Sequence, residues 1–309
     1  MLAHPADAAG PADVPAILTG LMDGFSVEVT PREAGKLPPL TEFVRPGTRV
    51  YITYLTNTAF EDTVATSAKA VAEGMRPVPH LAARAVPDRA TLDRIVGALA
   101  DVGVRDALVI AGSLRAPVGP YAETMQLLDS GVLQEHGFDS IGVAGHPEGN
   151  KDIGEPELAR ALADKNALAA RQGLALYLVT QFSFAPEPIV AWERRIRAAG
   201  NRLPIVVGLP GLTSPAKLLK FGLSCGVGAS LKVLRKQSGG VLKLASSAVY
   251  HPDQTLLGLA RAVHADPDTL IAGMHFYPFG ALAATAAYAE GLRAGRFTVE
   301  DGDRLDVTA

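Results

Sequence analysis

Eight short apolar segments, each followed by a helical pattern, constrain the fold of this chain more than any other feature. They begin near residues 25, 50, 76, 106, 140, 174, 204 and 270, about 25–34 residues apart except before the last. The clearest helical pattern spans residues 88–102, where apolar side chains recur at three- and four-residue steps and Gly103 follows. Eight strand–helix units predict a (β/α)8 TIM barrel, which needs ~250 residues.

A doubly wound open sheet is the alternative fold. Such sheets often have a glycine-rich phosphate loop after their first strand. This chain contains neither G-x-G-x-x-G nor G-x-x-x-x-G-K-[ST]. We therefore expect a flexible N-terminal lead-in over residues 1–20 and a single catalytic barrel over residues 21–300, with an elaborated segment at about 227–268.

Composition narrows the class of protein further. The chain has 309 residues, 48% of them hydrophobic, and a net charge of −3, which does not suggest a nucleic-acid binder. The single cysteine, Cys225, excludes an internal disulfide and a cysteine-based metal cluster. No apolar run approaches the ~18–20 residues of a membrane span, and the N-terminus does not resemble a signal peptide. A cytoplasmic protein without a membrane or nucleic-acid partner is expected.

Polar side chains gather where the predicted strands end. The segment Leu174–Phe184 is apolar for its first six residues and then changes to Thr180 and Gln181 between aromatic residues. Other strand ends carry Glu28, Thr53, His80, Gly112, Ser113, His146, Glu148, His275 and Tyr277. In a (β/α)8 barrel the carboxyl ends of all strands lie on the face that holds active sites. The sequence therefore predicts an active site there.

Glu28 is the sharpest catalytic candidate in this set. It lies between two valines near a strand end, so desolvation should raise its pKa towards the range of a general acid at neutral pH. Pairing with Arg32 is the alternative. A metal site built from Glu28 and the strand-end histidines is less favoured, because no H-x-H or H-x-x-x-H spacing is present, and no metal is expected. A serine hydrolase is also disfavoured, since no G-x-S-x-G motif is present.

Seven short motifs together resemble the methylenetetrahydrofolate reductase family, in its order and spacing over most of residues 24–290. Phe25–Pro31 resembles the S-F-E-F-F-P strand, and Thr53-Tyr54 resembles T-Y. The other five are Pro79–Leu81 for P-H-L, Val143–Glu148 for V-A-x-Y-P-E, Thr180–Phe184 for T-Q-F-F-F, Val207–Thr213 with Lys220-Phe221 for P-G-[IL] and K-F, and His275–Tyr277 for H-F-Y.

The resemblance implies a (β/α)8 enzyme that interconverts 5,10-methylenetetrahydrofolate and 5-methyltetrahydrofolate. It implies that Glu28 is the proton donor and that Gln181 binds the pterin of folate. It also implies substrate contacts for Phe221, Ser113 and Tyr277. FAD is the implied cofactor and NAD(P)H the reductant, and the expected cofactor-binding residues are Thr53, His80, Gly112, Ser113, Ala144 and His146.

Several positions depart from the family pattern. The R-G-D end of the fourth strand is Ala111–Ser113 here, and the tyrosine of Y-P-E is His146. The helix before Thr180 lacks a clear equivalent of the flavin-binding lysine, and the asparagine and arginine that usually follow H-F-Y are absent. Flavin-phosphate contacts are thus fewer than in the family, and direct hydride transfer from NAD(P)H to folate is an alternative.

Two interpretations from other classes stay open. One is a barrel that binds folate or flavin without catalysis. The other is a different TIM-barrel enzyme, such as a Schiff-base aldolase, although no predicted strand end carries the lysine that this chemistry needs. The expected partner is a small folate molecule, and a homo-oligomer is left open.

Overall fold

The computed structural model describes residues 14–56, 58–225 and 249–308. Eight strands form a closed barrel in the order β1 to β8, and the described pairings between them are parallel. The strands are β1 (Ser26–Val29), β2 (Arg49–Ile52), β3 (Arg76–Ala82), β4 (Asp106–Ile110), β5 (Ser140–Gly145), β6 (Ala175–Phe182), β7 (Ile205–Pro210) and β8 (Ile271–Tyr277). The chain is therefore a (β/α)8 TIM barrel, as the repeat predicts.

Helices alternate with these strands along the chain. They are α2 (Pro31–Ala34), α3 (Phe60–Ala72), α4 (Arg89–Asp101), α5 (Thr124–Leu128), α6 (Val132–Glu135), α7 (Glu155–Gln172), α8 (Pro186–Ala198), α9 (Pro215–Cys225), α11 (Asp253–Ala265) and α12 (Leu282–Arg293). Helix α4 shows why they form. Its N-cap Asp88 accepts a hydrogen bond from the backbone N–H of Thr91, and Leu92, Ile95, Val96 and Leu99 form its buried face.

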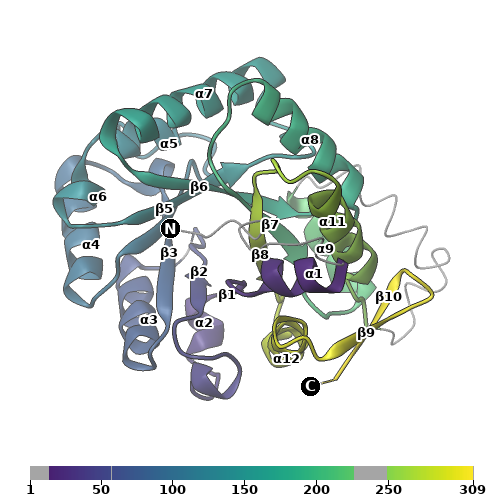
Figure 1. Cartoon of the computed structure of the whole chain (residues 1–309). Coiled ribbons are helices and arrows are strands. Elements are labelled where there is room, and N and C mark those ends of the chain that lie inside the picture. The colour runs from purple at the N-terminus through teal and green to yellow at the C-terminus, as the bar shows by residue number, and fades with distance from the viewer. Residues whose placement is uncertain (1–13, 57, 226–248, 309) are drawn as a thin grey trace. The chain divides into compact units, whose positions relative to one another are not determined.

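Contacts divide the chain into two compact units. Of the described residues, unit 1 comprises those of Glu28–Ala144 and Ala161–Leu178, and unit 2 comprises those from Val14 to Val27, Gly145–Arg160 and those from Val179 onward. In unit 1, helices α3, α4 and α6 pack successively against one another, and α3 contacts β2 and β3 (Figure 1).

A pair of tyrosines lies inside unit 1. The hydroxyls of Tyr51 on β2 and Tyr177 on β6 are 2.8 Å apart, and both side chains are buried. Since β2 and β6 are not neighbours in the strand order, this hydrogen bond crosses the interior of the barrel. Gly142 on β5 leaves room for it, because a Cβ there would approach the Tyr177 ring and hydroxyl to 3.1 Å.

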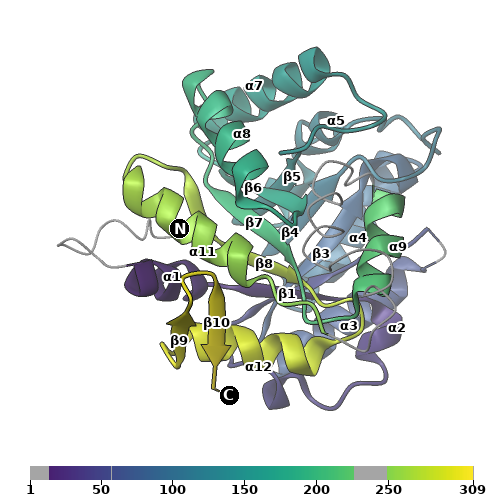
Figure 2. The ribbon, with the colours of Figure 1, turned by 90° about the vertical axis from the view of Figure 1, so that its right-hand side faces the viewer.

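Unit 2 contains three elements that the sequence patterns did not predict. Helix α1 (Val14–Met22) packs against α11 and α12, as Figure 2 shows, and buries Leu18, Leu21 and Met22. The expected flexible lead-in over residues 1–20 thus differs from the structure from Val14 onward, because this short segment has an apolar face to bury. Strands β9 (Phe297–Glu300) and β10 (Arg304–Val307) form an antiparallel hairpin that contacts α11 and α12 through β10.

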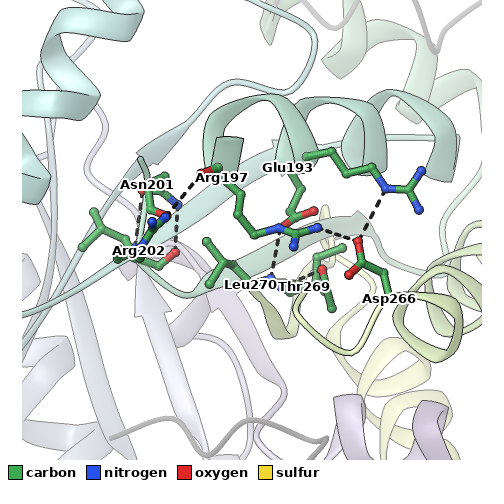
Figure 3. Close-up of polar contacts among 10 residues, drawn as sticks. Glu193, Arg197, Asn201, Arg202, Asp266, Thr269 and Leu270 are labelled. Carbon is green, nitrogen blue, oxygen red and sulfur yellow. Dashed lines mark hydrogen bonds and ion pairs between the residues drawn. The ribbon is translucent and has the colours of Figure 1, made fainter. Parts of the chain in front are cut away.

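An ion pair within α8 of unit 2 is hydrogen-bonded to the backbone just before β8 (Figure 3). Glu193 is 1% exposed and accepts a hydrogen bond from Arg197 Nε at 2.8 Å and from the backbone N–H of Leu270 at 3.1 Å. Arg197 also contacts Asp266 at 2.5 Å. These bonds fix the position of α8 next to the amino-terminal end of β8.

The elaborated segment expected at about 227–268 lies partly outside the described residues. Its described part contains α11, where the sequence predicts a helix near residues 254–263. Cys225 is the last residue of α9.

Candidate active site

Glu28 lies near the carboxyl end of β1. Its neighbours Val27 and Val29 are buried, and the Glu28 side chain is 18% exposed. Burial raises the pKa of Glu28 to about 7; a hydrogen bond with the Thr53 side chain lowers it, and the charge of Glu33 raises it further. A paired arginine would have shifted this pKa in the opposite direction, so the environment does not favour pairing with Arg32. The carboxyl group is thus suited to proton transfer near neutral pH.

His80 on β3 lies beside this carboxyl group. Its Nε2 is 3.6 Å from Glu28 Oε2, and its ring meets the ring of Tyr51 edge-on at 6.0 Å. Burial lowers the pKa of His80 to about 4, so the imidazole is neutral at pH 7. Among the described residues, the buried Nε2 of His80 has no hydrogen-bond partner. This buried nitrogen lies next to the Glu28 carboxyl group, 3.6 Å away.

The other predicted residues of unit 1 lie at or after strand ends. Thr53 follows β2, and its backbone N–H donates to the Val29 carbonyl at 3.0 Å. Ser113, after β4, is exposed, and its Oγ is 3.5 Å from Thr56 Oγ1. Gly112 adopts a φ of +91° and Ala144 is half-buried on β5. Unit 1 therefore brings Glu28, Thr53 and His80 together.

Three residues of unit 1 bear on whether it can hold the diphosphate of FAD: Arg84 after β3, Glu123 after β4 and Lys165 on α7. A dinucleotide diphosphate needs free cations or an open helix N-terminus. The Arg84 guanidinium donates instead to the carbonyl oxygens of Leu114 at 3.0 Å and Ala122 at 2.9 Å. Glu123 stands at the N-cap of α5, where its carboxylate disfavours a second anion. Burial lowers the pKa of Lys165 on α7, which disfavours its charged form. These residues do not fit the diphosphate of FAD.

Thr180 and Gln181 lie at the end of β6, in unit 2. Gln181 is exposed, whereas Thr180 is buried and its Oγ1 accepts the backbone N–H of Gly208 at 2.8 Å. The hydroxyl of Tyr277, at the end of β8, donates to the Thr180 carbonyl at 2.9 Å. A Cβ at Gly208 would lie 2.4 Å from that carbonyl, so only glycine permits this close packing. The polar strand end is thus rigidly supported, while the Gln181 side chain reaches solvent.

Phe221 lies on α9 and is 37% exposed. Its ring stacks on Phe279, with centroids 4.4 Å apart and planes 19° apart. Phe279 in turn is nearly parallel to Tyr277 and edge-on to Phe182. Sequence reasoning missed Phe279, although its place next to Gly280 in the loop after β8 is a turn signal.

Two further histidines of unit 2 lie near strand ends. His275 is buried on β8, where its Nδ1 is 2.9 Å from Ser26 Oγ. His146 follows β5 and is half-buried, and the nearby Glu148 accepts a hydrogen bond from Ser183 Oγ at 3.0 Å. In the described part of the chain, no group of three or more His, Cys, Asp or Glu residues could hold a metal ion. No helix there is long and apolar enough to cross a membrane.

Two solved structures share a distant likeness with this chain. A putative phosphonomutase from Burkholderia cenocepacia J2315 superposes with a TM-score of 0.49 and 12% identity, covering 93% of this chain and 100% of that one. A dihydropteroate synthase from Thermus thermophilus gives a TM-score of 0.43 and 15% identity, covering 86% of this chain and 91% of that one. At these scores the likeness carries no argument about function.

Comparison of sequences is more informative. Methylenetetrahydrofolate reductase 2 of Schizosaccharomyces pombe (strain 972 / ATCC 24843) is 24% identical over 163 residues, which cover 48% of this chain and 25% of that protein. The chain thus matches about a quarter of the length of this relative. The model of the family described as "Methylenetetrahydrofolate reductase" matches residues 37–233, which make up more than half of the chain. The chain therefore belongs to the methylenetetrahydrofolate reductase family.

Proposed function

We propose that this protein interconverts 5,10-methylenetetrahydrofolate and 5-methyltetrahydrofolate, with NAD(P)H as the reductant and Glu28 as the general acid. The observation that carries the proposal is the setting of Glu28. Its pKa is raised to about 7, and a neutral His80 lies 3.6 Å away. A carboxylic acid with such a pKa can hold a proton at neutral pH and release it during a reaction.

In the reducing direction, Glu28 donates its proton to N10 of the folate. The bond between N10 and the methylene carbon breaks, and the electrons of that bond go to N10. The methylene carbon is left as an iminium on N5. A hydride from NAD(P)H then adds to this carbon and produces the methyl group, and solvent returns the proton to Glu28. One NAD(P)H and one proton are consumed for each methyl group formed.

Other residues bind the two reactants in this proposal. Gln181 offers an exposed carboxamide for the pterin, and Phe221 offers an aromatic ring that is 37% exposed. Tyr277 and Ser113 complete the substrate contacts. The residues proposed to contact the hydride donor are Thr53, His80, Gly112, Ser113, Ala144 and His146.

Helix α9 favours an anionic ligand near Phe221. It has no acidic residue in its first turn, and Lys217 and Lys220 are exposed along it. These ammonium groups attract a phosphate or a carboxylate. Both NAD(P)H and folate carry such groups. Because Arg84, Glu123 and Lys165 do not fit the FAD diphosphate, we assign hydride transfer directly to NAD(P)H and route no step through a flavin.

The test is to replace Glu28 by Gln, which keeps the shape of the side chain and removes its proton. We expect Glu28→Gln to reduce the rate of methylenetetrahydrofolate-dependent NAD(P)H oxidation at least 100-fold. Binding of 5-methyltetrahydrofolate, measured by calorimetry, should change less than threefold. Glu42→Gln, at an exposed carboxylate of the same unit, is the matched control and should keep the wild-type rate.

Near-normal turnover in Glu28→Gln would contradict the assignment of the general acid. A wild-type protein that binds 5-methyltetrahydrofolate but never oxidises NAD(P)H would instead identify a folate-binding barrel without catalysis.

A further inference from the structure

The turn after β8 holds a bulky residue in an unfavourable backbone conformation. The Ala281 N–H donates to the Pro278 carbonyl at 3.0 Å, which closes a four-residue turn. Its two central residues, Phe279 and Gly280, have φ values of +49° and +83°. Positive φ at both central positions defines a type I′ turn, where Asn-Gly or Gly-Gly is usual. A phenylalanine at the first position is strained, because its Cβ crowds the backbone.

The strain places the Phe279 ring in an aromatic stack. The ring lies 4.4 Å from Phe221, with an interplanar angle of 19°, and 6.1 Å from Tyr277, with an angle of 18°. Phe182 meets it edge-on at 5.2 Å. Phe221 thus presents a flat face to Phe279 at the geometry that aromatic rings adopt with one another.

Phe279 packs on the edge of a buried core without being one of its fully buried members. Phe182, Phe184, Leu218 and Tyr250 form a buried cluster, and Phe279 is only partly buried against it. A half-exposed ring that is held by a strained turn contributes less to folding than a core residue would. Strain that persists in a half-exposed loop is more typical of binding sites than of cores.

We propose that the Phe279 ring occupies the position of a ligand ring on Phe221 and is displaced when that ligand binds. In the free protein its ring covers Phe221. When a planar heteroaromatic ring stacks on Phe221, Phe279 swings out about Gly280, whose lack of a side chain permits the rotation. Phe279 thereby determines how tightly and how selectively the site binds flat rings, since a ligand must first displace it.

Which ligand supplies the ring rests on the proposed function. Two reactants of that proposal carry a suitable group: the pterin of folate and the nicotinamide of NAD(P)H. The stacking chemistry is the same for both, so the experiment titrates them separately. Free pterin is included as a probe that requires no turnover and no knowledge of the reductant.

The main variant is Phe279→Gly, which removes the ring and suits the positive φ. We expect its Kd for the ligand that stacks on Phe221 to fall about 5- to 30-fold relative to wild type, since the Phe279 ring no longer competes. Phe279→Tyr retains a ring of the same shape and should stay within twofold of wild type. Asp301→Gly is the matched control: Asp301 also has a φ of +49° but lies in the β9–β10 turn. It relieves the same kind of strain and should leave the Kd of every ligand tested unchanged.

Titration of 5-methyltetrahydrofolate, NADH, NADPH and free pterin, followed by fluorescence, distinguishes the outcomes. Tighter binding of 5-methyltetrahydrofolate and pterin identifies the pterin as the displacing ring, and tighter binding of NADH or NADPH identifies the nicotinamide. If Phe279→Gly binds none of the four more tightly than wild type, the proposal is overturned, whether or not the enzyme turns over. If free pterin binds Phe279→Gly more tightly while wild type lacks reductase activity, the displaceable ring stands and the proposed function fails.

Discussion

At the level of single residues, the environment of Glu28 links the pH dependence of activity to that of stability. Burial raises the pKa of this carboxyl from 4.5 to about 7. The folded state therefore binds a proton between these values that the unfolded state has already released. The favourable contribution of protonated Glu28 is complete below pH 4.5 and is lost as the pH rises through 7.

Glu28→Gln should consequently stabilise the protein at high pH while it abolishes activity. We expect the free energy of unfolding of the variant to exceed that of wild type by about 1–3 kcal/mol at pH 8 and to match it at pH 4. Urea unfolding at both pH values checks this. A variant that is less stable than wild type at pH 8 would mean that ionised Glu28 has a stabilising partner, and the case for a general acid would weaken.

His80 makes the free energy of unfolding change with pH in the opposite direction. Its pKa is lowered from 6.5 to about 4 by burial, so its contribution to stability is lost as the pH falls from 6.5 towards 4. Between pH 4.5 and 6.5 the two slopes oppose each other. Between these pH values the unfolding free energy of wild type therefore changes little with pH, although the contributions of Glu28 and His80 each change steeply. Comparison with Glu28→Gln separates the two contributions.

The sequence predicts some of these residues better than others. Desolvation of Glu28 follows from its two flanking valines, because alternation along a strand fixes which side chains are buried. Its contact with His80 does not follow, since it joins β1 to β3, which are separated by a strand in the barrel order. The stack of Phe221 on Phe279 is also beyond the sequence, because it depends on a backbone conformation that phenylalanine rarely adopts.

At the level of elements, the buried Glu193 is the main polar tie between α8 and β8. Its carboxylate serves Arg197 and the backbone N–H of Leu270 (Figure 3). Glu193→Ala leaves both donors without this acceptor, so we expect a loss of about 2–4 kcal/mol in the free energy of unfolding. Arg194→Ala is the control, because Arg194 is 56% exposed and 3.7 Å from Asp266; it should change stability by about 0.5 kcal/mol or less.

Asp253 plays a comparable role for the C-terminal hairpin. Its carboxylate accepts hydrogen bonds from the Tyr288 hydroxyl at 2.6 Å and from the backbone N–H of Leu305 on β10 at 3.1 Å. Asp253→Ala should therefore release β10 before the barrel unfolds. Hydrogen exchange should show at least tenfold faster exchange in β9 and β10, with unchanged protection in β3 and β4. Equal loss of protection in all four strands would contradict a local role.

The strand–helix repeat predicts all eight barrel strands and most helices, because apolar runs and helical periodicity are local signals. Helix α1 and the hairpin β9–β10 escape that reasoning. Each is short and is stabilised by packing against α11 and α12. Helix α1 contacts these helices from far away in the sequence, and the hairpin contacts them through β10. Elements that are stabilised mainly by tertiary packing leave only a weak local pattern in the sequence.

For the whole molecule, the central question is which cofactor the reaction uses. Arg84 binds loop carbonyls and Glu123 occupies the N-cap of α5, so neither residue is suited to bind a flavin diphosphate. We expect the purified protein to lack flavin absorbance and to oxidise NAD(P)H with methylenetetrahydrofolate at the same rate with or without added FAD. A stoichiometric flavin spectrum, or a rate that rises severalfold on addition of FAD, would show that these contacts rearrange to bind it.

The hydrogen bond between Tyr51 and Tyr177 has a consequence for how such a barrel can evolve. Loss of one hydroxyl leaves the other buried without its partner, whereas loss of both leaves an apolar pair of nearly the same shape. Gly142 belongs to the same set, since a Cβ there would lie 3.1 Å from the Tyr177 ring and hydroxyl and would press Tyr177 to move. Substitutions at these three positions should therefore co-vary among relatives, with phenylalanine appearing at both tyrosine positions together. In laboratory evolution of this chain, the double replacement should be accepted where either single one is rejected.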